Sequence, residues 1–320
     1  MQHITLPQIK IFMKRSIAIC ALIVPTLLVI TGCTTQTASN NPPQPTSSSQ
    51  ASNEKAPETL TIAVITQSND KDKQEQERIL AEYLTKALKR PVSIQGTTDY
   101  NNAVQLLVEE KVQVAGLGPL SYIEAKQRNP QVEPIVAPIN KITGRPWYKS
   151  AIVVNSASGI KTIDDLKGKR FGFVSKLSTS GYMFPVVHLL EMGLNLDQDF
   201  ASVEFFKSHD NNLTALIDGK VDAVAIELNV YKKFKDAGKI DDSYQVIWES
   251  TPIPESPMVI SQKLPPQLIE ELKEAFTKAP SGMLTAMGVP ANGYTLVQDS
   301  DYDRVRQVRK QLDEKLAKKK

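Results

Sequence analysis

The alternation of short apolar segments with amphipathic segments constrains the fold of this chain more than any other feature of its sequence. From Leu60, residues 60–66 alternate large apolar side chains with smaller or polar ones, which is the period of a β-strand. Residues 71–89 place apolar side chains at steps of one, three and four, which indicates a helix with one buried face, and Pro91 marks its end. Because strands and helices continue to alternate, the sequence predicts an α/β fold.

Two runs of such elements are separated by the turn Gly144-Arg145-Pro146, and a chain of this length exceeds one typical core. The first run predicts strands at 92–95 and 112–116 and helices at 100–110 and 120–129. The second run predicts strands at 151–155, 170–174, 202–206 and 222–226 and helices at 182–192, 212–218 and 229–236. An extended crossing with three prolines follows, and then helices at 265–278, 281–287 and 301–317. We therefore expect one lobe from residues 60–148 and 251–320, and a second lobe from residues 149–250.

Residues 1–32 have the features of a secretion signal, in which three basic residues precede an apolar run at 17–30. The run is interrupted by Pro25 and is shorter than the ~20 apolar residues that a membrane-spanning helix needs. The sequence Ile30-Thr31-Gly32-Cys33 resembles the lipobox of bacterial lipoproteins, which implies that Cys33 becomes the first residue and carries a lipid. An ordinary signal peptide is the alternative.

Residues 33–59 are rich in Ser, Thr, Asn, Gln and Pro and contain almost no large apolar side chain. Such a segment cannot offset its ordering entropy by burial, so we interpret it as a flexible tether. We therefore expect an extracytoplasmic protein, periplasmic or at the cell surface, that is anchored to a membrane by its lipid.

The basic excess of the chain lies entirely in the predicted signal. The chain has 38 Lys and Arg against 35 Asp and Glu, and the three extra basic residues fall within residues 1–32, which hold no acidic residue. The remainder is electrically balanced, which disfavours nucleic acid as a partner. Cys20 is removed with the signal and Cys33 is lipidated, so no intramolecular disulfide is expected.

The segment Ser178-Thr179-Ser180-Gly181 has the outline of an anion site, because it lies between a predicted strand and a predicted helix start. Unpaired backbone N–H groups and the positive end of the helix dipole favour an anion there, and three hydroxyls add donors. The alternative is that Ser180 only caps the helix.

Two further segments follow strands in the same way. His209 can donate a hydrogen bond to the same anion, and Asp210 can hold its tautomer or cap the next helix, although an isolated His-Asp pair also occurs on ordinary surfaces. In the first lobe, a glycine-rich turn leads into Leu120, Ser121 and Tyr122. Their backbone N–H groups, with the phenols of Tyr122 and Tyr100, are candidate contacts from the opposite side of a cleft, though a tight turn needs no ligand.

Five motifs are informative when their order along the chain is taken together. They are Gly118-Pro119-Leu120-Ser121-Tyr122, Ile163-Asp164-Asp165-Leu166-Lys167-Gly168-Lys169, Ser178-Thr179-Ser180-Gly181-Tyr182, Ser208-His209-Asp210 and Val221-Asp222-Ala223. In this order they resemble the phosphonate and phosphite substrate-binding proteins of ABC transporters. The resemblance extends over roughly residues 60–291, and Ser-Thr-Ser-Gly followed by His-Asp is its most specific part.

The resemblance implies a type II periplasmic-binding-protein fold, in which two lobes joined by a two-strand hinge close on the ligand. It also implies that five residues bind the phosphorus oxygens: Tyr100, Ser178, Thr179, Ser180 and His209. Family members that bind aminoethylphosphonate use acidic residues against the amine, one of them in the stretch matching residues 253–257, where this chain has Ser256 at the matching position. Leu117 likewise replaces a family tyrosine. These departures favour phosphite or methylphosphonate as the ligand.

Glu227 follows a predicted buried strand, from which its side chain can point into the cleft. A carboxylate there can accept a proton from a monoprotonated ligand and repel a fully ionised one. The alternative is a solvated carboxylate at a helix start.

The expected function is therefore delivery of a small phosphorus oxyanion to the permease subunits of an ABC importer, by a protein that is not an enzyme and is expected to be a monomer. Ser180, His209 and Asp210 include the residue types of a hydrolase, but no Gly-x-Ser-x-Gly elbow is present and adjacent His and Asp rarely form a triad. With only His188 and His209 and no free thiol beyond the signal, we expect no metal and no other cofactor. Phosphate as the ligand and a sensor without a transporter remain alternatives.

Overall fold

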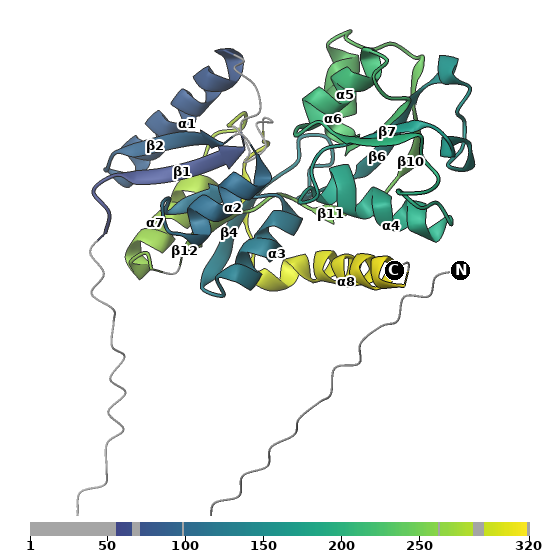
Figure 1. Ribbon diagram of the computed structural model, residues 1–320. Helices are drawn as coiled ribbons and strands as arrows, with labels where there is room; N and C mark the ends of the chain where they lie inside the picture. Colours follow the sequence, from purple (N-terminus) through teal and green to yellow (C-terminus); the bar gives the residue numbers. More distant parts are fainter. Residues whose placement is uncertain (1–55, 66–70, 98, 262, 284–290, 319–320) are drawn as a thin grey trace, which may run out of the picture. The chain divides into compact units, whose positions relative to one another are not determined.

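The computed structural model describes residues 56–65, 71–97, 99–261, 263–283 and 291–318. Strands of two separate β-sheets alternate with helices along the chain (Figure 1), so the expected α/β class is confirmed. The predicted signal, the tether and Cys33 lie outside the described residues, apart from residues 56–59. None of the helices in these ranges is long and apolar enough to cross a membrane.

The first sheet has six strands in the order β13-β4-β12-β3-β1-β2. The strand β1 pairs in parallel with both β2 and β3, whereas β12 returns from the other sheet and runs antiparallel between β3 and β4. The strand bounds are β1 Leu60–Ile65, β2 Val92–Thr97, β3 Val114–Gly116, β4 Val132–Pro138, β12 Met258–Ser261 and β13 Tyr294–Leu296. The helices that accompany this sheet in the chain are α1 Lys71–Leu88, α2 Tyr100–Val108, α3 Pro119–Arg128 and α7 Pro266–Thr277.

The second sheet has five strands in the order β10-β6-β9-β7-β8. The strand β7 pairs in parallel with β8 and β9, so the carboxyl ends of these three strands lie at one edge of the sheet. The strand bounds are β6 Ser150–Asn155, β7 Arg170–Phe173, β8 Ser202–Phe205, β9 Ala223–Glu227 and β10 Tyr244–Glu249. The helices of this part are α4 Phe184–Glu191, α5 His209–Ile217 and α6 Leu228–Asp236.

Two chain crossings connect the sheets and pair with each other. The short strand β5, Trp147–Tyr148, runs toward the second sheet, and β11, Ile253–Pro254, runs back antiparallel to it. The N–H of Glu255 donates a hydrogen bond to the carbonyl of Pro146 at 3.0 Å. The pairing of β5 with β11 therefore determines the positions of the side chains on both crossings.

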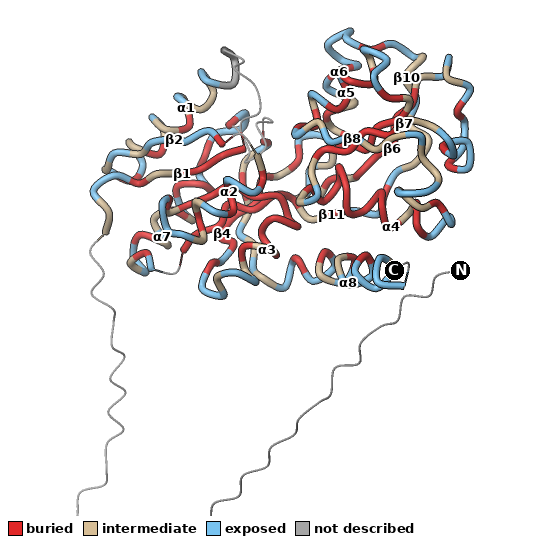
Figure 2. The backbone as a smooth tube through the Cα atoms, viewed as in Figure 1, coloured by how far each residue is buried: buried red, intermediate tan, exposed pale blue. Residues whose placement is uncertain are grey.

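Apolar side chains of the strands and of the inner helix faces form the core, while outer helix faces are exposed (Figure 2). The last helix, α8 Asp303–Ala317, packs against both α3 and α4, so it contacts elements that accompany both sheets. Its buried stripe consists of Val305, Val308 and Leu312, which belong to the same core cluster as the α4 side chains.

Four regular strands and two helix starts differ from the sequence expectation. The strands β4, β10, β12 and β13 were not predicted, because prolines punctuate or precede two of them and their antiparallel partners come from distant parts of the chain. The helix predicted from Tyr182 begins earlier, with a π-helical turn at Thr179–Met183. The helix predicted from Asn212 begins at His209. Of the helix predicted at 281–287, the first residues form a turn and the rest lies outside the described ranges.

Candidate ligand-binding site

The loop after β7, residues 178–183, turns the chain tightly into α4, and we call it the Ser178 loop. The Ser178 hydroxyl caps its start by accepting a hydrogen bond from the N–H of Gly181 at 3.0 Å. The carbonyl of Ser180 accepts a hydrogen bond from the Ser150 hydroxyl at 2.6 Å, which ties the loop to β6. The side chains of Ser178, Thr179 and Ser180 are all buried. The loop therefore presents hydroxyls and helix-start N–H groups from a fixed backbone.

Gly181 permits this close turn, because a Cβ atom there would lie 2.3 Å from the Val174 side chain. We expect Gly181→Ala to lower the free energy of unfolding by about 1–3 kcal/mol through overpacking, measured by urea denaturation. The matched control is Gly118→Ala, since a Cβ at Gly118 would meet Tyr100 only at an ordinary contact of 3.5 Å. Equal stability of the two variants would show that the turn does not need glycine.

Two buried tyrosines lie beside the Ser178 loop. Tyr100 begins α2, which Asp99 caps, and its hydroxyl has no hydrogen-bond partner among the described residues. Burial raises the pKa of Tyr100, and the nearby Ser178 hydroxyl offsets part of that rise. Tyr148 comes from the crossing strand β5; burial raises its pKa most, the charges of Glu227 and Glu255 raise it further, and Ser180 lowers it. Both phenols are therefore neutral donors close to the loop.

Sequence reasoning identified Tyr100 but missed Tyr148. Tyr148 stands on a two-residue strand, which has too few residues for a periodic pattern. Its only signal was its place just after the turn that ends the first run of elements.

The His209 imidazole is buried and its tautomer is fixed by a backbone group. Its Nδ1 accepts a hydrogen bond from the N–H of Glu227 at 3.0 Å. Burial lowers the pKa of His209 to about 4, and the charge of Asp210 acts weakly in the opposite direction. The ring is therefore neutral at pH 7, with Nδ1 as acceptor and Nε2–H as donor.

Asp210 does not hold the His209 tautomer, contrary to one interpretation of the sequence. Its carboxylate forms an ion pair with Lys233 of α6 at 3.0 Å, where both side chains are partly exposed. The reason is that His209 and Asp210 occupy the first turn of α5, where adjacent residues point in different directions.

The start of α3 lies beside the Ser178 loop, and the expectation that Leu120, Ser121 and Tyr122 contact the ligand stays a prediction. The N–H of Leu120 donates to the Thr179 hydroxyl at 2.9 Å, and the Ser121 hydroxyl donates to the carbonyl of Leu177 at 3.1 Å. The Tyr122 hydroxyl donates to the carboxylate of Asp299. The start of α3 therefore contacts the Ser178 loop directly, while Tyr122 points toward the segment that precedes α8.

Two buried carboxyl groups stand next to these donors. Glu227 ends β9 and accepts a hydrogen bond from the Asn229 amide at 3.0 Å. Glu255 follows β11 and accepts one from the Asn140 amide at 2.8 Å. Burial raises the pKa of both groups, and the charge of Glu227 raises that of Glu255 further. Each therefore favours a protonated state or a nearby cation more than an ordinary carboxyl group does.

Sequence reasoning identified Glu227. On the crossing that contains β11, it placed Ser256 at the position that faces the site. Ser256 is buried, but it is Glu255 that lines the cavity. One residue along an extended segment reverses the direction of a side chain, and the pairing of β11 with β5 decides which residue faces inward.

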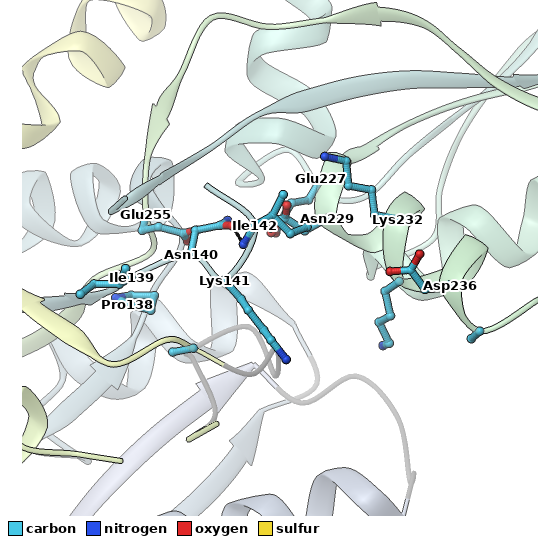
Figure 3. A pocket seen from close by; sticks show the side chains of 13 residues that line it. Pro138, Ile139, Asn140, Lys141, Ile142, Glu227, Asn229, Lys232, Asp236 and Glu255 are labelled. Carbon is cyan, nitrogen blue, oxygen red and sulfur yellow. Dashed lines mark hydrogen bonds between the residues drawn. The ribbon is translucent and has the colours of Figure 1, made fainter. Parts of the chain in front are cut away.

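Glu227 and Glu255 border a cavity of about 660 Å³ between the two sheets (Figure 3). Its remaining walls come from the loop after β4 and from α6. The residues that line it are Pro138, Ile139, Asn140, Lys141, Ile142, Glu227, Asn229, Lys232, Lys233, Asp236, Ala237, Glu255 and Ala291. Within the part of the chain that the structure describes, no group of three or more His, Cys, Asp or Glu side chains is placed to hold a metal ion.

The arrangement combines neutral donors with carboxyl groups. Hydroxyls, helix-start N–H groups and a neutral imidazole can bind an oxyanion without a basic side chain. The adjacent carboxyl groups can bind a cation or a protonated ligand oxygen.

Comparison with known proteins places this geometry in a family. The profile of a family described as ABC transporter, phosphonate, periplasmic substrate-binding protein matches residues 62–302. The phosphate-import protein PhnD of Mycolicibacterium smegmatis is 28% identical over 275 residues, which cover 79% of this chain and 85% of that protein. The phosphonates-binding periplasmic protein of Escherichia coli K12 is 31% identical over 173 residues, which cover 52% of this chain and 50% of that protein.

A solved structure shows the same fold. The structure of PhnD1 from Prochlorococcus marinus in complex with methylphosphonate matches with a TM-score of 0.71 at 20% identity, covering 80% of this chain and 98% of that one. The expected type II fold of two lobes is therefore confirmed. Members of the matching family bind substrates for transport and are not enzymes. The chain belongs to the family of periplasmic substrate-binding proteins that serve phosphonate ABC transporters.

Proposed function

We propose that this protein holds the phosphonate group of its ligand at the Ser178 loop, with Tyr100, Tyr148 and His209 as further donors. The observation that carries this proposal is the buried Tyr100 hydroxyl, which has no hydrogen-bond partner among the described residues and lies beside the capped start of a helix. A buried hydroxyl without a hydrogen bond is costly, so a ligand oxygen is a fitting partner. The neutral Nε2–H of His209 supports the same role.

The test is calorimetric titration of the purified full-length protein with methylphosphonate, 2-aminoethylphosphonate, phosphite and phosphate in parallel. We expect at least one phosphonate to bind, with affinity reduced about tenfold or more by Ser180→Ala, since hydrogen bonds to charged groups contribute about 1.5–3 kcal/mol. Absence of heat with all four ligands, in folded protein freed of bound ligand, would refute the proposal. Tighter binding of phosphate than of any phosphonate would instead favour phosphate import.

A second candidate ligand class is an aminoalkylphosphonate, which the buried pair Glu227 and Glu255 favours. The sequence expectation of phosphite or methylphosphonate rested on Ser256 and on Leu117, but Glu255, the residue before Ser256, lines the cavity. An ammonium group between the two carboxylates would offset the repulsion and desolvation that raise their pKa values. In the titration panel, 2-aminoethylphosphonate would then bind more tightly than methylphosphonate.

We further propose that residues 60–148 with 251–320 and residues 149–250 are the two lobes that close on the ligand about the β5–β11 hinge. The hydrogen bond from Leu120 to Thr179 joins the two lobes in the present arrangement and is suited to a closing contact. The protein is proposed to act as a monomer, as a carrier that delivers one ligand at a time.

The lipid anchor is also a proposal, supported by the sequence at Cys33 and the polar segment after it. We expect Cys33→Ala to move the protein from the membrane fraction to the soluble fraction after expression in a bacterial host. The measurement is immunoblotting of both fractions, and Cys20→Ala is the control, since Cys20 lies inside the proposed signal. Membrane association that survives Cys33→Ala would show that Cys33 does not carry the anchor.

A further inference from the structure

The cavity lies next to the two carboxyl groups that adjoin the proposed phosphonate site. Glu227 and Glu255 line it, but the Ser178 loop, Tyr100 and His209 do not. Its volume of about 660 Å³ falls within the range of about 300–1,000 Å³ that is typical of sites for drug-sized ligands. The space adjoining the carboxylates thus exceeds what a methyl or aminoethyl substituent fills.

The outer walls of this space carry cationic side chains. Lys141 comes from the loop after β4, and Lys232 comes from α6 (Figure 3). Lys233, the next residue of α6, also lines the cavity. Lys233 is paired with Asp210, whereas neither Lys141 nor Lys232 has an ion-pair partner within the described ranges. These two lysines are the positive charges that remain available to a ligand.

The loop that carries Lys141 is held in place. The Asn140 side-chain oxygen accepts hydrogen bonds from the N–H groups of Ile142 at 2.9 Å and Thr143 at 3.2 Å, while its amide nitrogen donates to Glu255. The buried Asn140 side chain thus holds the Glu255 carboxyl group and the loop that carries Lys141 in fixed positions relative to each other.

Resting on the proposed function, we propose that the outer cavity binds a carboxylate of the ligand, so that the substrate class is an amino acid with a phosphonate side chain. Such a ligand carries a phosphonate for the Ser178 loop, an ammonium for Glu227 and Glu255, and a carboxylate for Lys141 or Lys232, whose side chains extend in different directions (Figure 3). Each charged group of the ligand then lies next to protein groups that complement its charge. An aminoalkylphosphonate without the carboxylate leaves both lysines unused.

The test compares two ligands that differ only in the carboxylate. 2-Amino-3-phosphonopropionate is 2-aminoethylphosphonate with a carboxylate on the carbon that bears the amine. We expect the full-length protein to bind the carboxylated ligand about fivefold to tenfold more tightly at low salt, because partly exposed ion pairs give modest gains that salt screens. The double variant Lys141→Gln/Lys232→Gln should abolish this advantage and leave the affinity for 2-aminoethylphosphonate within about twofold.

The matched control is Lys235→Gln, because Lys235 lies on the same helix but pairs with Asp242 outside the cavity lining. It should keep the advantage of the carboxylated ligand. The inference is overturned if the carboxylate gives no advantage, or if the advantage persists in the double variant. If methylphosphonate binds and neither amino ligand does, the inference fails and phosphonate binding stands. If no phosphonate binds, the proposed function itself has failed.

Discussion

We expect the His209→Ala protein to bind its preferred phosphonate about 100-fold more weakly than the unchanged protein. The substitution removes a buried Nε2–H donor and leaves the N–H of Glu227 without its acceptor. A hydrogen bond to a charged group contributes about 1.5–3 kcal/mol, and the upper part of that range corresponds to the expected loss. Calorimetric titration of both proteins measures it.

The control for this prediction is the neighbouring variant Asp210→Asn. The Asp210 carboxylate is paired with Lys233 in a partly exposed position, so its loss should change affinity by less than about threefold. Affinity that is retained in His209→Ala, or lost equally in both variants, would show that His209 does not donate to the ligand.

We expect Glu255→Gln to weaken the binding of one phosphonate ligand and to leave that of another nearly unchanged. Binding of 2-aminoethylphosphonate should weaken about tenfold to 50-fold, because a charge-assisted hydrogen bond to the ammonium is lost. Binding of methylphosphonate should change by less than about threefold, because burial and the charge of Glu227 raise the pKa of Glu255, so that without a cation the group is largely neutral, as Gln is. Titration of the same protein preparation with both ligands measures the two changes.

The control is Glu249→Gln, because Glu249 is exposed and paired with Lys149 away from the cavity lining. It should leave both affinities unchanged. If Glu255→Gln weakens or strengthens both ligands together, Glu255 does not discriminate an ammonium ligand.

The same carboxyl group predicts a pH dependence of stability in the ligand-free protein. Burial and the charge of Glu227 raise the folded-state pKa of Glu255, so the folded state holds a proton that the unfolded state has released. The free energy of unfolding should therefore fall as pH rises from the ordinary carboxyl pKa of about 4.3 through the raised value of the folded state. Urea denaturation across this pH range should show a smaller fall in the free energy of unfolding for Glu255→Gln than for the unchanged protein.

Much of the site could be predicted because of where its residues stand along the strands. Ser178, His209 and Glu227 follow or end β7, β8 and β9, whose parallel pairing brings their carboxyl ends to one edge. An alternating pattern of strands and helices is visible in the sequence, and it suffices to bring such residues together. No local pattern could identify Tyr148 or Glu255, because each stands on a crossing of only two paired residues.

The sequence by itself determined the α/β class, most of the parallel strands and the helix-start loop that carries Ser178, because hydrophobic period and capping are local properties of neighbouring residues. Only the tertiary structure decided which side chains face the cavity. It gave Leu120, Ser121 and Tyr122 partners within the protein, placed Asp210 outside, and turned Glu255 inward in place of Ser256. These outcomes depend on the packing of α3, on the first turn of α5 and on the pairing of β5 with β11, which join residues far apart in the chain.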